Sequence, residues 1–163
     1  SINSRRLLNL GQGMHKAEFG EVESIKKPPH YEAIHQLALD IVNAPNKQQE
    51  WAAYNRLKEI CDKFAGTPLD HPFQWETLAD FTYQKPEVAL SYYFKALKLA
   101  MLLELEDYLA SINFAIAENY LEKADKAQAL NFANTALTFA EQAADDELQL
   151  DINELIIEAK SLP

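Results

Sequence analysis

The stretch AENYLEKADKAQALNFANTA, residues 117–136, places small and aromatic residues at a spacing typical of paired helices. Ala117, Tyr120, Ala129 and Ala136 follow one another at intervals of three, nine and seven residues. Small residues on both helices let the paired backbones approach closely, while the aromatic side chain fills the gap beside the turn. The stretch therefore predicts two antiparallel helices joined by a short turn.

A second copy of this pattern lies upstream. Its first helix carries Trp75, Leu78 and Ala79, and its second helix carries Ala89, Tyr93 and Ala96. Together the two copies resemble the tetratricopeptide repeat, whose helix pairs carry a small, aromatic, Ala, Ala signature at this spacing. The resemblance covers roughly residues 73–144 and implies a short right-handed superhelix of stacked helix pairs.

The chain departs from the family pattern in three respects. The interval from Ala89 to Ala129 is longer than the family's period of about 34 residues. The turn before Pro86 is shorter than the family's turn, and Asn113 and Glu141 stand where the family often has Trp and Pro. A plain helical bundle therefore remains the alternative architecture.

Hydrophobic periodicity predicts seven helices after an N-terminal arm at residues 1–29. The expected helices cover residues 30–43, 46–64, 72–83, 86–103, 106–123, 125–144 and 146–162. Asn46, Asp125 and Asp145 are the expected N-caps, and Gly66 ends the second helix. The last helix has apolar residues on one face and acids on the other, which is typical of a terminal capping helix.

Composition supports the all-α class and a single helical domain over residues 30–163. Only 4 Gly are present, 48% of residues are hydrophobic, and Ala, Leu, Glu and Lys dominate over β-branched runs. The arm at residues 1–29 holds three of those Gly and the pair Pro28-Pro29, and we expect it to be extended or partly disordered. Cys61 lies on an apolar helical stripe with Trp51 and Leu57, which indicates a buried thiol.

The formal net charge of -10 argues against nucleic acid and anionic membranes as partners. It is compatible with a basic partner, or with an acidic surface kept for solubility. No apolar run approaches the length of about 18 residues that a membrane span needs, so the default location is the cytoplasm. A signal removed from the N-terminus is compatible with a chain that begins at Ser1.

The common motifs of catalysis and cofactor binding are absent from the sequence. The chain has no Gly-rich phosphate loop, no nucleophile-elbow Ser, no Cys-x-x-Cys and no His-Glu-x-x-His. His30 and His35 are five residues apart, which turns them to different faces of a helix. The expectation is therefore a protein with no catalytic residues, no metal and no cofactor.

The family resemblance implies a concave partner-binding groove lined by the first helix of each pair. The groove positions are Phe73, Glu76, Thr77, Asp80 and Tyr83, followed by Ser111, Phe114, Ala115, Glu118, Leu121 and Glu122. Of these, the acidic, aromatic and large apolar side chains are the candidate binding residues: Phe73, Glu76, Asp80, Tyr83, Phe114, Glu118, Leu121 and Glu122.

These positions hold acids and apolar side chains but no Lys or Arg, so the implied ligand is a protein or peptide segment with basic and apolar residues. The expected function is that of a protein-binding module or adaptor, and a homodimer is compatible with it. Two alternatives remain by analogy with the fold: a chaperone or assembly factor for a secreted or membrane-associated partner, and a regulatory helical domain of a longer protein.

Overall fold

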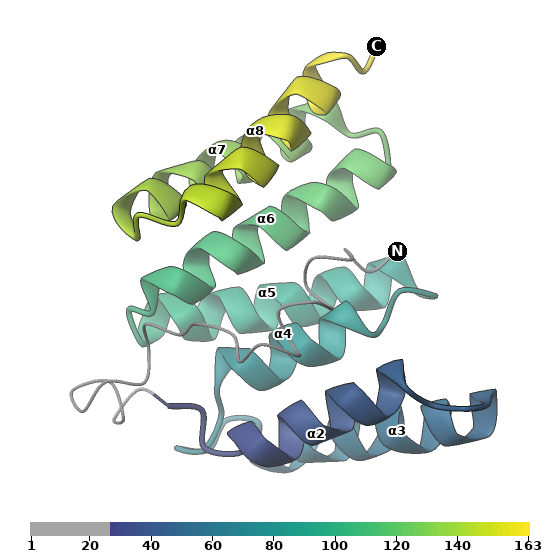
Figure 1. Ribbon diagram of the computed structural model, residues 1–163. Helices are drawn as coiled ribbons and strands as arrows, with labels where there is room; N and C mark the ends of the chain where they lie inside the picture. Colours follow the sequence, from purple (N-terminus) through teal and green to yellow (C-terminus); the bar gives the residue numbers. More distant parts are fainter. Residues whose placement is uncertain (1–26) are drawn as a thin grey trace. The chain divides into compact units, whose positions relative to one another are not determined.

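The computed structural model describes residues 27–163, which form α-helices and no strand (Figure 1). The helices are α2 (Tyr31–Val42), α3 (Lys47–Phe64), α4 (Pro72–Asp80), α5 (Pro86–Leu102), α6 (Glu106–Glu122), α7 (Lys126–Gln142) and α8 (Asp146–Lys160). The predicted all-α class with seven helices is therefore confirmed for this part of the chain. Residues 1–26 of the predicted arm lie outside the described residues.

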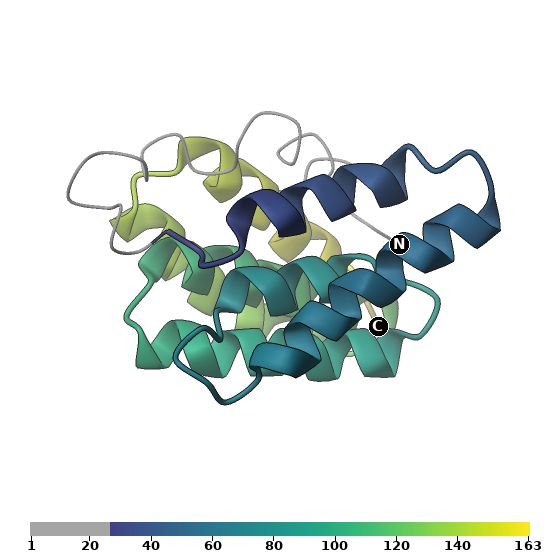
Figure 2. The same cartoon turned by 90° about the horizontal axis from the view of Figure 1, so that it is seen from below.

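The chain divides into two compact units, with the boundary between Tyr92 and Tyr93 inside α5. In unit 1, α2 and α3 run antiparallel side by side, and α4 contacts both of them (Figure 2). In unit 2, α6, α7 and α8 follow one another as antiparallel neighbours, with α7 contacting both α6 and α8. Each unit thus consists of consecutive helices joined by short turns.

The predicted helix caps are confirmed by their hydrogen bonds. Asn46 Oδ1 accepts from the Gln49 amide at 2.9 Å. Asp125 and Asp145 accept in the same way from the amides three residues later, at 3.1 and 3.0 Å. These carboxylates bond amides that have no partner within the helix and oppose the positive end of the helix dipole.

The third helix ends earlier than the sequence pattern predicts. It stops at Asp80, so Tyr83 lies in the turn that follows and not on the helix. The Thr82 hydroxyl donates to the Leu78 carbonyl at 2.7 Å and thereby satisfies one acceptor of the last helical turn. The same carbonyl also accepts from the backbone amide of Phe81, at 3.2 Å.

The core of unit 1 includes the predicted buried thiol. Leu57, Cys61 and Leu78 have no exposed surface. The Cys61 thiol donates to the Gln74 carbonyl at 3.3 Å, and burial raises the pKa of the thiol to about 12. Cys61 is therefore a protonated packing residue, as its position on the apolar stripe predicts.

Unit 2 uses one turn geometry three times. Glu104, Ala124 and Ala144 each have a positive φ, at 54°, 58° and 53°. The amide of the next residue bonds back to the helix that has just ended: Leu105 to Ala100 O, Asp125 to Tyr120 O and Asp145 to Ala140 O, at 3.0, 2.9 and 3.0 Å. This is the Schellman arrangement, which caps the last helical carbonyls.

The repeated turn explains the spacing of the sequence pattern. Helices α6, α7 and α8 begin at Glu106, Lys126 and Asp146, so successive helices start at equal intervals along the chain. Two helices with their turns therefore span the interval from Glu106 to Asp146, which equals the interval from Ala89 to Ala129. Helices α6 and α7 have 17 residues each, so two of them fill the family's period of about 34 residues before any turn is counted. The length of the helices therefore accounts for the longer interval between Ala89 and Ala129.

The core of unit 2 is built around small residues on α7. Ala129, Ala133, Ala136 and Ala140 are fully buried. They share one cluster with Ala110, Phe114 and Ala117 of α6 and with Ile152, Leu155, Ile156 and Ala159 of α8. At the edge of this cluster Tyr120 stacks on Phe132 with ring centroids 5.6 Å apart. The small residues singled out in the sequence thus lie at the helix contacts, as predicted.

Enlarging a buried Ala on α7 should separate the helices. We expect Ala129→Leu or Ala136→Leu to lower the free energy of unfolding by about 1–3 kcal/mol, since neither side chain has room to grow. Urea denaturation followed by circular dichroism measures the effect. Ala127→Leu, at an exposed position on the same helix, is the matched control and should be near neutral. Unchanged stability in both buried variants would contradict the helix pairing.

Glycine should stabilise the two turns that hold Ala in the left-handed region. We expect Ala124→Gly and Ala144→Gly each to raise the free energy of unfolding by about 0.5–1 kcal/mol, because the relief of strain exceeds the added chain entropy. Ala143→Gly, next to one of them but with φ at -82°, should instead destabilise. Thermal denaturation of the three variants shows whether each substitution stabilises or destabilises the protein. Equal changes in stability at Ala143 and Ala144 would contradict the role of the left-handed conformation.

Candidate functional site

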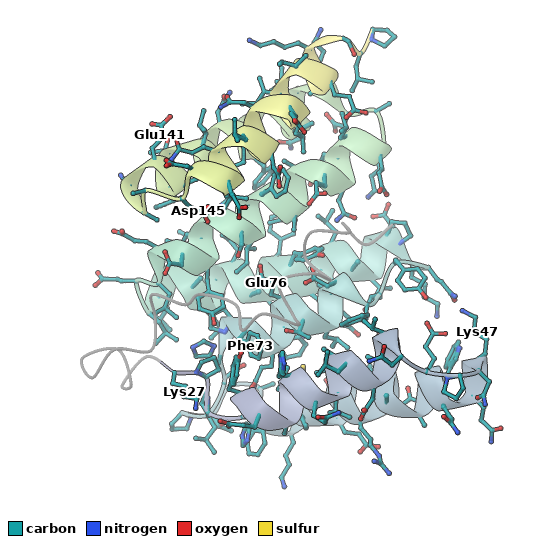
Figure 3. The ribbon with its side chains drawn as sticks, viewed as in Figure 1. Lys27, Lys47, Phe73, Glu76, Glu141 and Asp145 are labelled. Atoms are coloured by element: carbon teal, nitrogen blue, oxygen red, sulfur yellow. The ribbon has the colours of Figure 1, made fainter. Side chains whose placement is uncertain are left out.

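The predicted binding residues on α4 are partly inside the protein. Phe73 and Glu76 are 1% and 3% exposed, and both lie on α4 as labelled in Figure 3. Phe73 stacks on Tyr31 of α2 with ring centroids 5.3 Å apart, so it packs inside unit 1. Asp80 and Tyr83 are half-buried at the end of α4 and in the turn that follows.

The predicted residues on α6 change from buried to exposed along the helix. Phe114 is 5% exposed and belongs to the core of unit 2. Glu118 and Leu121 are half-buried, and Glu122 is exposed. Residues three and four apart share a helix face, so Glu118, Leu121 and Glu122 lie together at the end of α6.

The α4 residues belong to unit 1 and the α6 residues to unit 2. The concave groove that would combine them therefore stays a prediction. Within unit 1, however, one of these residues, Tyr83, lines a pocket with a volume of about 120 Å³. The pocket lies between the first turns of α3, the end of α2 and the turn that joins α4 to α5. Its lining residues are Ile41, Glu50, Trp51, Tyr54, Phe81, Thr82, Tyr83, Gln84 and Lys85.

A hydrogen-bond chain holds one wall of the pocket. Tyr54 Oη and Thr82 Oγ1 are 2.8 Å apart. Because the single hydroxyl proton of Thr82 is donated to the Leu78 carbonyl, Tyr54 is the donor to Thr82. The Tyr54 ring on α3 is thereby tied to the end of α4, which fixes its orientation in the wall.

A second set of polar contacts holds the opposite wall. Tyr83 Oη donates to Glu50 Oε1 at 2.8 Å, and Lys47 Nζ lies 3.0 Å from Glu50 Oε2. Two hydrogen bonds lower the pKa of Glu50: the one from Lys47 has the larger effect and the one from Tyr83 the smaller. The same bond to Glu50 is the main cause that raises the pKa of Tyr83. A charged carboxylate therefore fixes the Tyr83 ring at physiological pH.

Trp51 is the most accessible aromatic side chain of the lining, with 55% of its surface exposed. Its position on the apolar stripe of α3 favours a buried core residue, and the stripe is indeed buried further along, at Leu57 and Cys61. The chain turns at Phe81 after α4 has ended, and the pocket formed with this turn lies beside Trp51.

Sequence patterns did not indicate Glu50, Trp51 and Tyr54 as site residues. The sequence did carry a signal for Glu50, because Lys47 and Glu50 are an i,i+3 pair of opposite charge in the first turn of a helix. The partner of that pair across the pocket, Tyr83, is 33 residues away in the chain. Only the tertiary structure shows that these side chains meet.

Metal-binding clusters and membrane-spanning helices are both lacking in the described part of the chain. Across residues 27–163 no group of three or more His, Cys, Asp or Glu side chains is arranged to hold a metal ion. Over the same range none of the helices combines the length and the apolar character that crossing a membrane requires.

Comparison with known proteins adds no relative. No protein-family model, curated protein or solved structure matches this chain.

Acid should loosen the pocket through Glu50. The pKa of Glu50 in the folded protein lies below the ordinary value of 4.5. The stability that its contacts with Lys47 and Tyr83 contribute is therefore complete above pH 4.5 and is lost as the pH falls through the folded pKa. We expect Trp51 fluorescence to change below about pH 4.5, before the helical circular dichroism signal is lost. Glu50→Gln should abolish this early change, and Trp51→Phe should remove the signal itself. The same acid transition in Glu50→Gln would contradict this role.

Proposed function

We propose that this chain is a protein-binding module without catalytic activity, and that it takes a segment carrying apolar and basic side chains. The pocket of unit 1 carries the proposal. It combines an exposed Trp51 with the ring of Tyr83, held in place by Glu50, beside a volume of about 120 Å³. A concave site with aromatic walls and few fixed polar groups is the usual form of a ligand-binding site.

The pocket suits an apolar anchor better than a charged one. The carboxylate of Glu50 already contacts Lys47. A further cation at this carboxylate would meet the ammonium group of Lys47. An aliphatic or aromatic side chain instead fills the volume and excludes water from the rings of Tyr54, Phe81 and Tyr83.

The basic residues of the segment are drawn by the rest of the protein. The formal net charge of -10 attracts a cationic partner at long range. Close to the pocket, the exposed face of Trp51 offers a stacking surface to an Arg or Lys side chain. An adaptor of this kind needs no cofactor.

A selection from a random peptide library, displayed on phage, tests the proposal without a known partner. We expect the enriched peptides to combine an aromatic or Leu residue with Lys or Arg. Their affinity should fall by roughly tenfold or more in Trp51→Ala and in Tyr83→Ala, because buried aromatic contacts dominate such interfaces. Affinity should also fall with salt, since the Debye length shortens from about 10 Å at 0.1 M to about 3 Å at 1 M.

The matched control is Leu69→Ala, which removes an exposed apolar side chain of unit 1 outside the pocket. We expect it to leave the affinity unchanged. Equal losses in Leu69→Ala and Trp51→Ala would show that the pocket is not the binding site. Enrichment of acidic peptides would contradict the expected charge of the segment.

A further inference from the structure

Helix α8 carries large apolar side chains on the face opposite to its packed face. Ile152, Leu155, Ile156 and Ala159 are buried against the rest of unit 2, which confirms the predicted apolar face, but the other face carries more than the acids that the sequence pattern predicts. On the other side Leu150 is 66% exposed and Ile157 is 71% exposed. Residues seven apart lie on one helix face, so these two side chains form a common apolar strip.

Helix α6 shows what the corresponding face does inside the fold. When Glu106, the start of α6, is aligned with Asp146, the start of α8, the residues Ile112, Asn113 and Ile116 correspond to Ile152, Asn153 and Ile156, with identical residue types. All four of the isoleucines are buried. The two helices therefore occupy equivalent positions in the repeat.

In that register Leu150 and Ile157 correspond to Ala110 and Ala117, which are 1% and 0% exposed. On α6 this face is covered, because Ala110 and Ala117 lie in the same core cluster as Ala129 and Ala133 of α7. The strip on α8 thus occupies the position at which the repeat places another helix. The geometry points to a helix, and not an extended strand, as its ligand.

The charges around the strip select the kind of helix. Asp146, Glu147, Glu154 and Glu158 are exposed carboxylates on α8, and they lie on or beside the face of Leu150 and Ile157. The exposed Lys160 is the basic residue on this helix. A second copy of the chain that docked through the same face would bring acid against acid, which disfavours self-association through α8.

We propose that the Leu150 and Ile157 strip of α8 binds an amphipathic helix of a partner protein, whose apolar face is flanked by Lys or Arg. The apolar face of the partner helix contacts the strip on α8 in the way that α7 contacts the equivalent face of α6. Basic side chains of the partner helix pair with Glu154, which lies on the strip between Leu150 and Ile157, and with Glu158 beside it. This surface belongs to unit 2 and is separate from the pocket of unit 1.

A synthetic helical probe tests the proposal. The probe has the sequence of residues 126–142, because α7 is the helix that covers the equivalent face, with Lys in place of Gln128, Asn134 and Glu141, which are exposed on α7. A control probe carries Glu at the same positions. Binding of each to the full chain is measured by isothermal titration calorimetry and by the gain of peptide helicity. We expect the Lys probe to bind more tightly than the Glu probe.

The double variant Leu150→Ser with Ile157→Ser should lower the affinity for the Lys probe by roughly tenfold or more, since it removes the apolar contact. The matched control is Met101→Ser with Leu102→Ser, which removes two side chains of unit 2 that are 62% and 77% exposed elsewhere, and it should have no effect. Glu154→Lys with Glu158→Lys should reverse the preference between the two probes. In a chain that already carries Trp51→Ala, the loss caused by Leu150→Ser with Ile157→Ser should be the same as in the wild-type chain, which separates this surface from the pocket.

Three results would overturn the proposal. The first is a lack of measurable binding of the Lys probe to the wild-type chain. The second is an equal loss in the α8 variant and in the Met101 and Leu102 variant. The third is a dimer in sedimentation equilibrium that Leu150→Ser with Ile157→Ser makes monomeric, because a second copy of the chain would then be the occupant.

Discussion

The close approach of helices along the alanines of α7 is the constraint on which unit 2 depends. Ala129, Ala133, Ala136 and Ala140 present only methyl groups to the core, and all of them are fully buried. Since α7 contacts both α6 and α8, the same small side chains limit how far each neighbour stands from it. The larger side chains of the cluster are supplied by the neighbours, through Phe114 on α6 and Ile152 and Leu155 on α8.

The repeated turn keeps this packing in register. A helix of 17 residues followed by a left-handed residue brings the next helix back antiparallel after a constant interval, and such a turn occurs at Glu104, Ala124 and Ala144. None of these residues is Gly, although a positive φ favours Gly. Local strain at each turn is thus tolerated because tertiary packing of the helices outweighs it. The register in turn makes α6 and α8 equivalent, which supports the assignment of the strip at Leu150 and Ile157 as a helix-packing face.

Much of the fold could be predicted from the sequence, because local signals agree with tertiary packing. The caps at Asn46, Asp125 and Asp145 and the spacing of Ala129 and Ala136 were sufficient to place the helices within a few residues. The end of α4 was mispredicted, because the helix stops at Asp80 although the apolar periodicity continues to Tyr83.

The site was less predictable than the helices. Tyr83 was singled out as a groove residue and lines the pocket, but its partner Glu50 lies 33 residues away, and no local pattern reports such a contact. Phe73 and Phe114, which the family resemblance assigns to a groove, pack within unit 1 and unit 2, and the groove itself stays a prediction. Trp51 had the periodicity of a core residue and is exposed, since burial depends on which helix arrives beside it.

The two proposed binding surfaces obtain their order from different physical sources. Polar contacts orient the pocket: Tyr54 and Tyr83 are each tied by a hydroxyl hydrogen bond, so their rings are positioned before any ligand arrives. The strip on α8 does not depend on side-chain hydrogen bonds, because the helix itself holds Leu150 and Ile157 at a fixed separation. Exposed apolar side chains invite self-association, and the acids around the strip oppose it while favouring a basic partner. The same carboxylates can therefore serve solubility and selectivity on one helix face.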